Sequence, residues 1–224
     1  MSYTFDWTPI WAHRGLIIDG LLTTIGLSAL ALALAVIIGS AAGTAAASRR
    51  RGLRLCAAIY VEAMRNVPLL VHMYLWYVGF AFLRLPPFLC AVLGLSLYSG
   101  AYVAEIVRAG IGAVPRGQAL AAIASGLTHG QAMLLVVYPQ ALRIVAPSIA
   151  SVLSQIIKDS SLASVITVAE ITYQAAAIEG QTFRAFEVYM TIWLLYLVLV
   201  TAATYGLLLV PVTGAGDSPR GEYA

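Results

Sequence analysis

The stretch from Gly20 to Ser48 contains no charged residue and consists mainly of Ala, Leu, Ile, Val and Gly. A helix needs roughly 20 apolar residues to cross a bilayer core of about 30 Å. The whole chain is 61% hydrophobic and only 10% charged, whereas a soluble domain carries about 25% charged residues. So few charged residues cannot cover the surface of a water-soluble protein of this size. The sequence therefore predicts a polytopic membrane protein.

The fold class that follows is all-α, because the apolar stretches are continuous blocks and do not alternate with period two, as the strands of a membrane barrel would. We expect one transmembrane domain over residues 1–224. Five apolar segments serve as its expected spans, at about 20–48, 57–83, 86–107, 144–169 and 188–210.

Basic residues near the span ends indicate the orientation, since Lys and Arg concentrate in short cytoplasmic loops. Four arginines follow the first span within the segment SRRRGLRL. If that side is cytoplasmic, eight basic residues lie inside and three lie outside. We therefore expect the N-terminus outside, the C-terminal tail with Arg220 inside, and a cytoplasmic loop at about 109–143.

Several function classes are excluded by composition and motifs. The formal net charge of +3 is too small for a nucleic-acid-binding footprint. The two cysteines and three histidines are scattered, with no metal-ligand spacing. The only lysine, Lys158, is not part of a phosphate-binding loop. We expect no catalytic residue, no metal site and no cofactor bound by this chain, and any ATP must be used by a separate subunit.

The sequence predicts two short helices in the cytoplasmic loop. Pro115 and the alanines after it predict a short helix at about 116–125, ended by Gly126 as a left-handed cap. Thr128 and Gln131 fit a capping box that begins a second helix, which Pro139 should limit at Tyr138.

The first of these helices has small side chains at every third position, namely Ala119, Ala122 and Ser125. Small side chains let another surface approach closely. By physical argument alone, the loop is either a partner-docking element or an interfacial hairpin on the lipid head groups.

Five spaced segments resemble the signature blocks of one family: YVEAMRNVPLL (60–70), AYVAEIVRAGI (101–111), GQALAAIASGL (117–127), YPQALR (138–143) and KDSSLASVITVAE (158–170). That family comprises the permease subunits of bacterial ATP-binding-cassette (ABC) importers in the polar amino acid and opine branch. The match runs in order from about residue 20 to 205. Its cytoplasmic signature implies that an ATPase is contacted by Gly117, Gln118, Leu120, Ala121, Ala122, Gly126 and Leu127.

The resemblance implies a multipass protein of the bacterial inner membrane that translocates polar amino acids or opines. Its implied partners are two ATPase subunits, a second permease and an external substrate-binding protein. Leu120 stands where the family usually has Glu, which favours a second permease that differs from this chain over an identical one. The individual substrate is not readable, since the selecting residues lie partly in the binding protein.

Ionisable and polar residues within the expected spans are candidates for the substrate path, because charge at membrane depth is costly. These candidates are Glu62, Arg65, Lys158, Asp159, Ser160, Ser161 and Glu170. Two arrangements are open: a broken fourth span whose backbone lines a wet cavity, or an earlier span end that leaves the Lys–Asp pair at the outer interface.

Two other function classes compete with the importer. An ion-coupled secondary carrier or channel would use the same ionisable residues without an ATPase. A membrane assembly factor would not depend on Lys158 and Asp159 at all. A separate feature, Gly39 to Gly43, is a small-xxx-small motif that serves either packing within the chain or a dimer seam.

Overall fold

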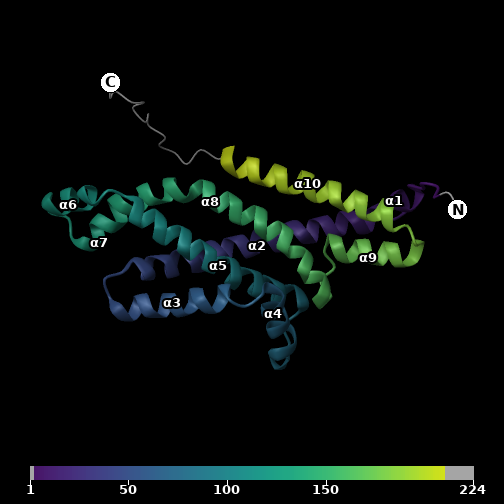
Figure 1. Ribbon diagram of the computed structural model, residues 1–224, viewed down its shortest axis with the longest axis horizontal. Helices are drawn as coiled ribbons and strands as arrows, with labels where there is room; N and C mark the ends of the chain where they lie inside the picture. The colour runs from purple at the N-terminus through teal and green to yellow at the C-terminus, as the bar shows by residue number, and fades with distance from the viewer. Residues whose placement is uncertain (1–2, 210–224) are drawn as a thin grey trace, which may run out of the picture.

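The computed structural model describes residues 3–209, all of whose regular elements are helical. They form an elongated bundle with α6 and α7 at one end and α1 and α9 at the other (Figure 1). The α-helices are α1 (Thr8–Ala12), α2 (Arg14–Ala47), α3 (Arg51–Arg65), α4 (Leu69–Tyr74), α5 (Pro87–Ala113), α6 (Arg116–Ala124), α7 (His129–Ala132), α8 (Tyr138–Asp159), α9 (Ile171–Thr182) and α10 (Ala185–Leu209). Shorter turns are η1 (Leu75–Gly79), η2 (Ala81–Leu83), η3 (Met133–Val137) and η4 (Ser160–Ile166).

Four helical segments within residues 3–209 are long and apolar enough to cross a membrane: Arg14–Ala47, Pro87–Ala113, His129–Ile166 and Ala185–Leu207. They confirm the predicted all-α membrane fold. At 1.5 Å per residue, α2 alone measures about 51 Å, which exceeds the bilayer core of about 30 Å. Its ends therefore reach beyond the hydrocarbon.

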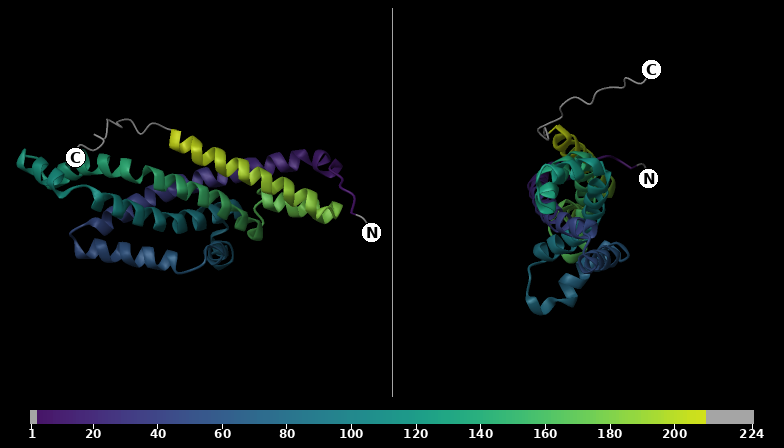
Figure 2. Two further views of the ribbon diagram at one scale, coloured as in Figure 1. Left: turned by 45° about the horizontal axis from the view of Figure 1, so that its top comes forward. Right: turned by 90° about the vertical axis from the view of Figure 1, so that its left-hand side faces the viewer.

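The second predicted span, 57–83, is divided in the structure. The amphipathic helix α3 ends at Arg65, and Pro68 precedes α4 with an extended backbone. Proline keeps the residue before it out of the helical conformation, which explains the break. The segment from α4 to η2 then projects sideways from the bundle (Figure 2).

The helix expected to end at Tyr138 continues instead. A π-helical turn, η3, joins α7 directly to α8. Because a π turn shifts the hydrogen-bond register, it accommodates Pro139, which has no N–H and lies in the first turn of α8. Local π adjustments of this kind let membrane helices tolerate proline, and α8 also contains Pro147.

Helices α2 and α5 approach each other through glycines. A Cβ atom added to Gly39 would lie 2.5 Å from the Cβ of Val103 and 2.6 Å from the carbonyl oxygen of Gly100. A Cβ added to Gly43 would lie 2.5 Å from the carbonyl oxygen of Ala104. The small-xxx-small motif thus serves packing within the chain, as one of the two interpretations predicts.

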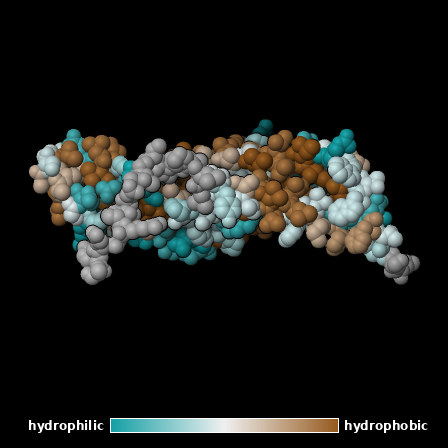
Figure 3. Space-filling view, turned by 90° about the horizontal axis from the view of Figure 1, so that it is seen from above, coloured by the Kyte–Doolittle hydropathy of each residue, from teal (hydrophilic) through white to brown (hydrophobic). Residues whose placement is uncertain are grey.

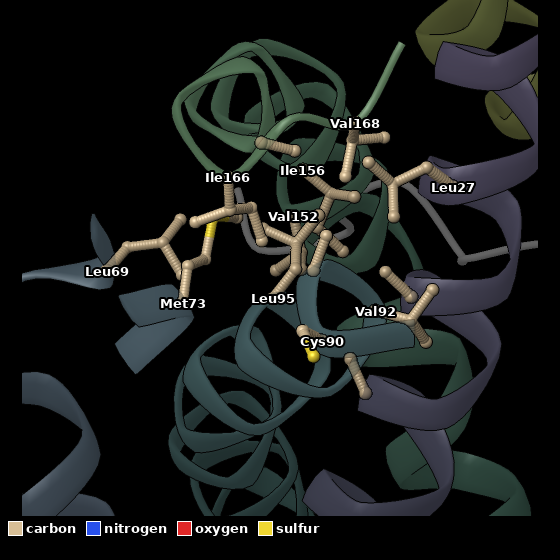
Figure 4. Packing of buried hydrophobic residues seen from close by; sticks show 14 of the residues in the cluster. Leu27, Leu69, Met73, Cys90, Val92, Leu95, Val152, Ile156, Ile166 and Val168 are labelled. Atoms are coloured by element: carbon tan, nitrogen blue, oxygen red, sulfur yellow. The ribbon is translucent and has the colours of Figure 1, made fainter. Parts of the chain in front are cut away.

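The largest apolar core lies beside this contact. Leu27 of α2, Met73 of α4, Leu95 of α5, Ile156 of α8 and Ile166 of η4 are all fully buried in one cluster (Figure 4). Five elements therefore converge on one point of the bundle.

The outward surface is apolar where lipid would contact it. Seen from the side of α10, hydrophobic residues gather over α10 in the half of the molecule that lies toward the N-terminus (Figure 3). The exposed side chains of α10 include Trp193, Leu194, Leu197 and Val198.

The glycine contact predicts a stability effect. Gly39→Ala should lower the free energy of unfolding by about 1–3 kcal/mol, because the added methyl group overpacks against α5. Thermal unfolding in detergent measures the change.

Gly26→Ala is the matched control, since Gly26 lies on the same helix and has nothing within 4 Å of an added Cβ. Equal melting temperatures for the two variants would show that the close approach of α2 and α5 does not stabilise the bundle.

Candidate functional site

A polar cavity of about 580 Å³ opens between the end of α3, the middle of α5 and the second half of α8. It lies beside the break at Pro68, where α3 stops. The residues that line it are Arg65, Tyr98, Ser99, Tyr102, Glu105, Ile106, Ser148, Ser151, Val152, Gln155 and Asp159.

Arg65, the last residue of α3, lines the cavity and contacts two side chains of α5. Its guanidinium lies 5.2 Å from the ring centroid of Tyr102, a cation–π distance. Its Nη1 lies 3.9 Å from Oε2 of Glu105. The same carboxylate accepts two hydrogen bonds from Arg108, at 3.2 and 3.1 Å, so Arg108 and Glu105 form the local pair expected for residues i and i+3.

The opposite wall belongs to α8. The side-chain amide of Gln155 donates a hydrogen bond of 2.7 Å to Oδ1 of Asp159, and this holds the carboxylate one turn above the amide. Ser148 and Ser151 add hydroxyl groups below them. The Tyr98 and Tyr102 hydroxyls, 3.1 Å apart, complete the polar lining from α5. The cavity thus offers the guanidinium of Arg65, with the carboxylate of Glu105 beside it, from α3 and α5, and the carboxylate of Asp159 from α8.

Two of the seven predicted path residues, Arg65 and Asp159, line this cavity. The other five do not. Glu62 is exposed on α3 and accepts a 2.7 Å hydrogen bond from Asn66. Lys158 is exposed on α8 outside the cavity lining.

The hydroxyls of Ser160 and Ser161 bond back to the carbonyls of Ile157 and Lys158, at 2.7 and 2.8 Å. At Asp159, α8 passes directly into the 3₁₀ turn η4 within the helical segment His129–Ile166, and neither serine is among the residues that line the cavity.

Glu170 has a different setting. It is fully buried and caps α9, accepting hydrogen bonds from the backbone N–H groups of Thr172 at 2.9 Å and Tyr173 at 2.7 Å. It also accepts one from the hydroxyl of Tyr196 on α10, at 2.9 Å. Burial raises the pKa of Glu170, although its hydrogen bonds act in the opposite direction. Through these hydrogen bonds, the side chain of Glu170 links the start of α9 to α10; we call this contact the joint at Glu170.

Sequence reasoning missed most of the lining residues, although a signal was present. On α5, Tyr98, Tyr102 and Glu105 recur at intervals of four and three residues. On α8, Ser148, Ser151, Gln155 and Asp159 do the same. This is the helical period of one face, so the two polar stripes were readable in the sequence, whereas their mutual approach was not.

The cytoplasmic segment has the predicted local structure. Helix α6 is followed by Gly126 at φ +93°, which confirms the left-handed cap. Thr128 and Gln131 form the predicted capping box, in which each side chain bonds the other residue's backbone N–H. No role in docking follows from these bonds by themselves.

The face of α6 that is open to a partner differs from the expected one. Ala122 is buried at 9% exposure, and Ala119 packs on a cluster formed by Val114, Val137 and Ala141. Through these small residues, α6 packs against the rest of its own chain. The exposed face instead carries Gln118, Leu120, Ala121 and Ala124, with Leu120 66% exposed. Among residues 3–209, no three His, Cys, Asp or Glu side chains group as metal ligands.

The comparison with known families decides the class of protein. Residues 35–215 match the family described as the binding-protein-dependent transport system inner membrane component. The chain belongs to this family. As a member it is a multipass permease subunit of the inner membrane and not an enzyme, and its transport system includes ATPase subunits and a substrate-binding protein.

Three relatives illustrate this membership. The "Probable glutamine ABC transporter permease protein GlnM" of Bacillus subtilis (strain 168) is 36% identical over 84% of this chain and 88% of its own length. The glutamine transport system permease protein GlnP of Escherichia coli (strain K12) is 34% identical over 90% and 94%. A crystal structure of an amino acid ABC transporter with histidines has a permease-like chain of TM-score 0.84 and 36% identity, covering 92% of this chain and 98% of that one.

The joint at Glu170 yields a stability prediction for this permease. Glu170→Ala should lower the free energy of unfolding by about 2–4 kcal/mol, because it removes a helix cap, leaves the backbone N–H groups of Thr172 and Tyr173 without their acceptor and removes the carboxylate that Tyr196 contacts. Thermal unfolding of the purified chain in detergent measures this loss.

Glu170→Gln is the control. It keeps one accepting oxygen but turns the other, which also accepts in the original chain, into an NH2 group that faces a donor. Its melting temperature should therefore lie between those of the original chain and the Ala variant. If the Gln variant unfolds as early as the Ala variant, both carboxylate oxygens are required at Glu170.

Proposed function

We propose that this permease serves an ATP-driven importer of polar amino acids, and that the cavity between α3, α5 and α8 lies on the substrate path. The observation that carries the proposal is that Arg65 and Asp159 line one cavity from two different helices. An α-amino acid is a zwitterion whose carboxylate and ammonium groups are attached to the same carbon atom. Arg65 suits the carboxylate, since guanidinium groups bind carboxylates with two parallel hydrogen bonds, and Asp159 suits the ammonium group.

The relatives support the same substrate class. The printed names of GlnM and GlnP specify glutamine, and the solved transporter is titled as an amino acid transporter. The hydroxyls of Tyr98, Tyr102, Ser148 and Ser151 would bind a polar side chain. Opines, which carry an amino-acid head, fit the same arrangement.

A second permease completes the path. Arg65 and Glu105 are 42% and 37% exposed in the isolated chain, at the level of the middle of α5. Charged side chains at membrane depth face a protein interior or a water-filled cavity. The open side of the cavity therefore faces another permease subunit. Leu120 favours a partner that is not identical to this chain, because the resemblance gives an acidic contact that two copies of this chain would both lack.

The α6 end of the bundle is the cytoplasmic end in this proposal. Arginines at 49, 50, 51 and 54 gather there, in agreement with the excess of basic residues in cytoplasmic loops. The N-terminus is outside, the C-terminal tail is inside, and two ATPase subunits dock at α6 and hydrolyse ATP. This chain binds no cofactor. The external binding protein delivers substrate at the α9 end.

Uptake of radiolabelled glutamine tests the cavity, in proteoliposomes that hold the complete transporter with its binding protein and internal ATP. Arg65→Gln and Asp159→Asn should each lower the rate by about 10- to 100-fold, since each removes a charge-assisted hydrogen bond. Arg51→Gln, an exposed arginine outside the cavity, should keep the original rate.

Two results would contradict the proposal. One is full uptake by both cavity variants, which would move the path elsewhere. The other is uptake by this chain alone without ATP, which would favour the ion-coupled carrier.

The exposed face of α6 gives a separate prediction for ATPase docking. Ala121→Trp places a bulky ring on that face and should abolish co-purification of the ATPase without reducing membrane insertion. Ala12→Trp, the same change at an exposed position near the opposite end, should leave association intact.

Unchanged association of the Ala121→Trp variant would move the docking surface away from α6. Ala122→Trp is not suitable for this purpose, because Ala122 packs inside the chain.

A further inference from the structure

A second cavity, of about 710 Å³, lies at the α6 end of the bundle. It is bounded by the end of α2, by α6, and by the helical segment from α7 through η3. Arg49, Arg50 and Arg116 all line it, and so do the side chains of His129 and Tyr138. The arginines come from two different elements, so the fold brings them together.

Among residues 3–209, no acidic side chain compensates the charge of this cavity. None of its lining residues is Asp or Glu. Within residues 3–209, the guanidinium groups of Arg49, Arg50 and Arg116 form no ion pair or hydrogen bond with another residue. Three like charges around one hollow repel each other, so an anion bound there would lower the electrostatic energy.

The depth of the cavity indicates which anion is available. The uncharged stretch of α2 runs to Ser48, and Arg49 follows it directly. Arginines at a span end extend to the head-group level of the bilayer. Lipid phosphates lie at that level.

The remaining wall is apolar, with the side chains of Leu120, Ile123 and Met133. An apolar wall excludes water and strengthens the attraction between the arginines and a phosphate bound beside it.

We propose that this cavity is a binding site for one anionic phospholipid, with Arg49 and Arg116 on its phosphate. Basic pockets between membrane helices hold anionic head groups in this way. The site is distinct from the substrate cavity and concerns a ligand that is not transported. A lipid bound there would join the end of α2 to α6, the element proposed to contact the ATPase.

The test is a lipid titration of the complete, delipidated transporter in detergent, with bound lipid counted by native mass spectrometry. The probes are phosphatidylglycerol, phosphatidylcholine with the same acyl chains, and inorganic phosphate. We expect phosphatidylglycerol to bind more tightly than phosphatidylcholine. The double variant Arg49→Gln with Arg116→Gln should weaken that binding by about 30-fold, from two guanidinium contacts.

Arg51→Gln with Arg54→Gln is the matched control, because it removes the same charge from exposed neighbours outside the cavity. It should change the affinity by less than about threefold, since general attraction between a basic surface and an anionic head group falls off with distance. Replacing Arg49 and Arg116 by Lys should retain most of the binding, which separates loss of charge from loss of fold.

Three results would overturn the proposal. Equal weakening by the control pair would mean non-specific attraction. Equal competition by inorganic phosphate would mean a free-anion site. Lipid binding only after removal of the ATPase subunits would assign these arginines to the ATPase contact. Because bound lipid is the readout, each result leaves the proposal for amino acid uptake standing.

Discussion

The close approach of α2 and α5 is the contact on which the rest of this structure depends. In a bilayer, helices gain no hydrophobic energy from leaving water together, so they associate through van der Waals packing and small residues. Gly39 and Gly43 bring the backbone of α2 against α5, with less than 3 Å left for a side chain. The fully buried cluster around Leu95 then assembles on this pair.

The other face of α5 carries the polar chemistry. Val103 and Val107 meet the glycines of α2, whereas Tyr98, Tyr102 and Glu105 face the cavity shared with α3 and α8. One helix thus separates an apolar seam from the proposed substrate path. The other walls of the cavity are α3, which ends just before the break at Pro68, and α8, which leads through η3 to α6. If the ATPase docks at α6 as proposed, a displacement of α6 would reach the cavity along one continuous helical segment.

The sequence predicted what depends on local patterns. The uncharged stretch of α2, the Gly126 cap and the Thr128 capping box each follow from residues close together in the chain, and the structure has all three. The division of 57–83 was missed because hydropathy averages over Pro68. The open face of α6 was missed because α6 packs against η3, a contact between two segments that the local pattern of α6 does not predict. Arg65 and Asp159 were identified as charges at membrane depth, but their convergence on one cavity with Glu105 required the packing of three helices.

We conclude that this chain works as one subunit of an ATP-driven importer. Affinity purification of the chain from its native membrane in a mild detergent, followed by mass spectrometry of the bound proteins, tests this directly. We expect an ATPase and a second permease subunit to purify with it in fixed stoichiometry. A folded, monodisperse chain that purifies alone, and transports amino acids without ATP, would contradict it.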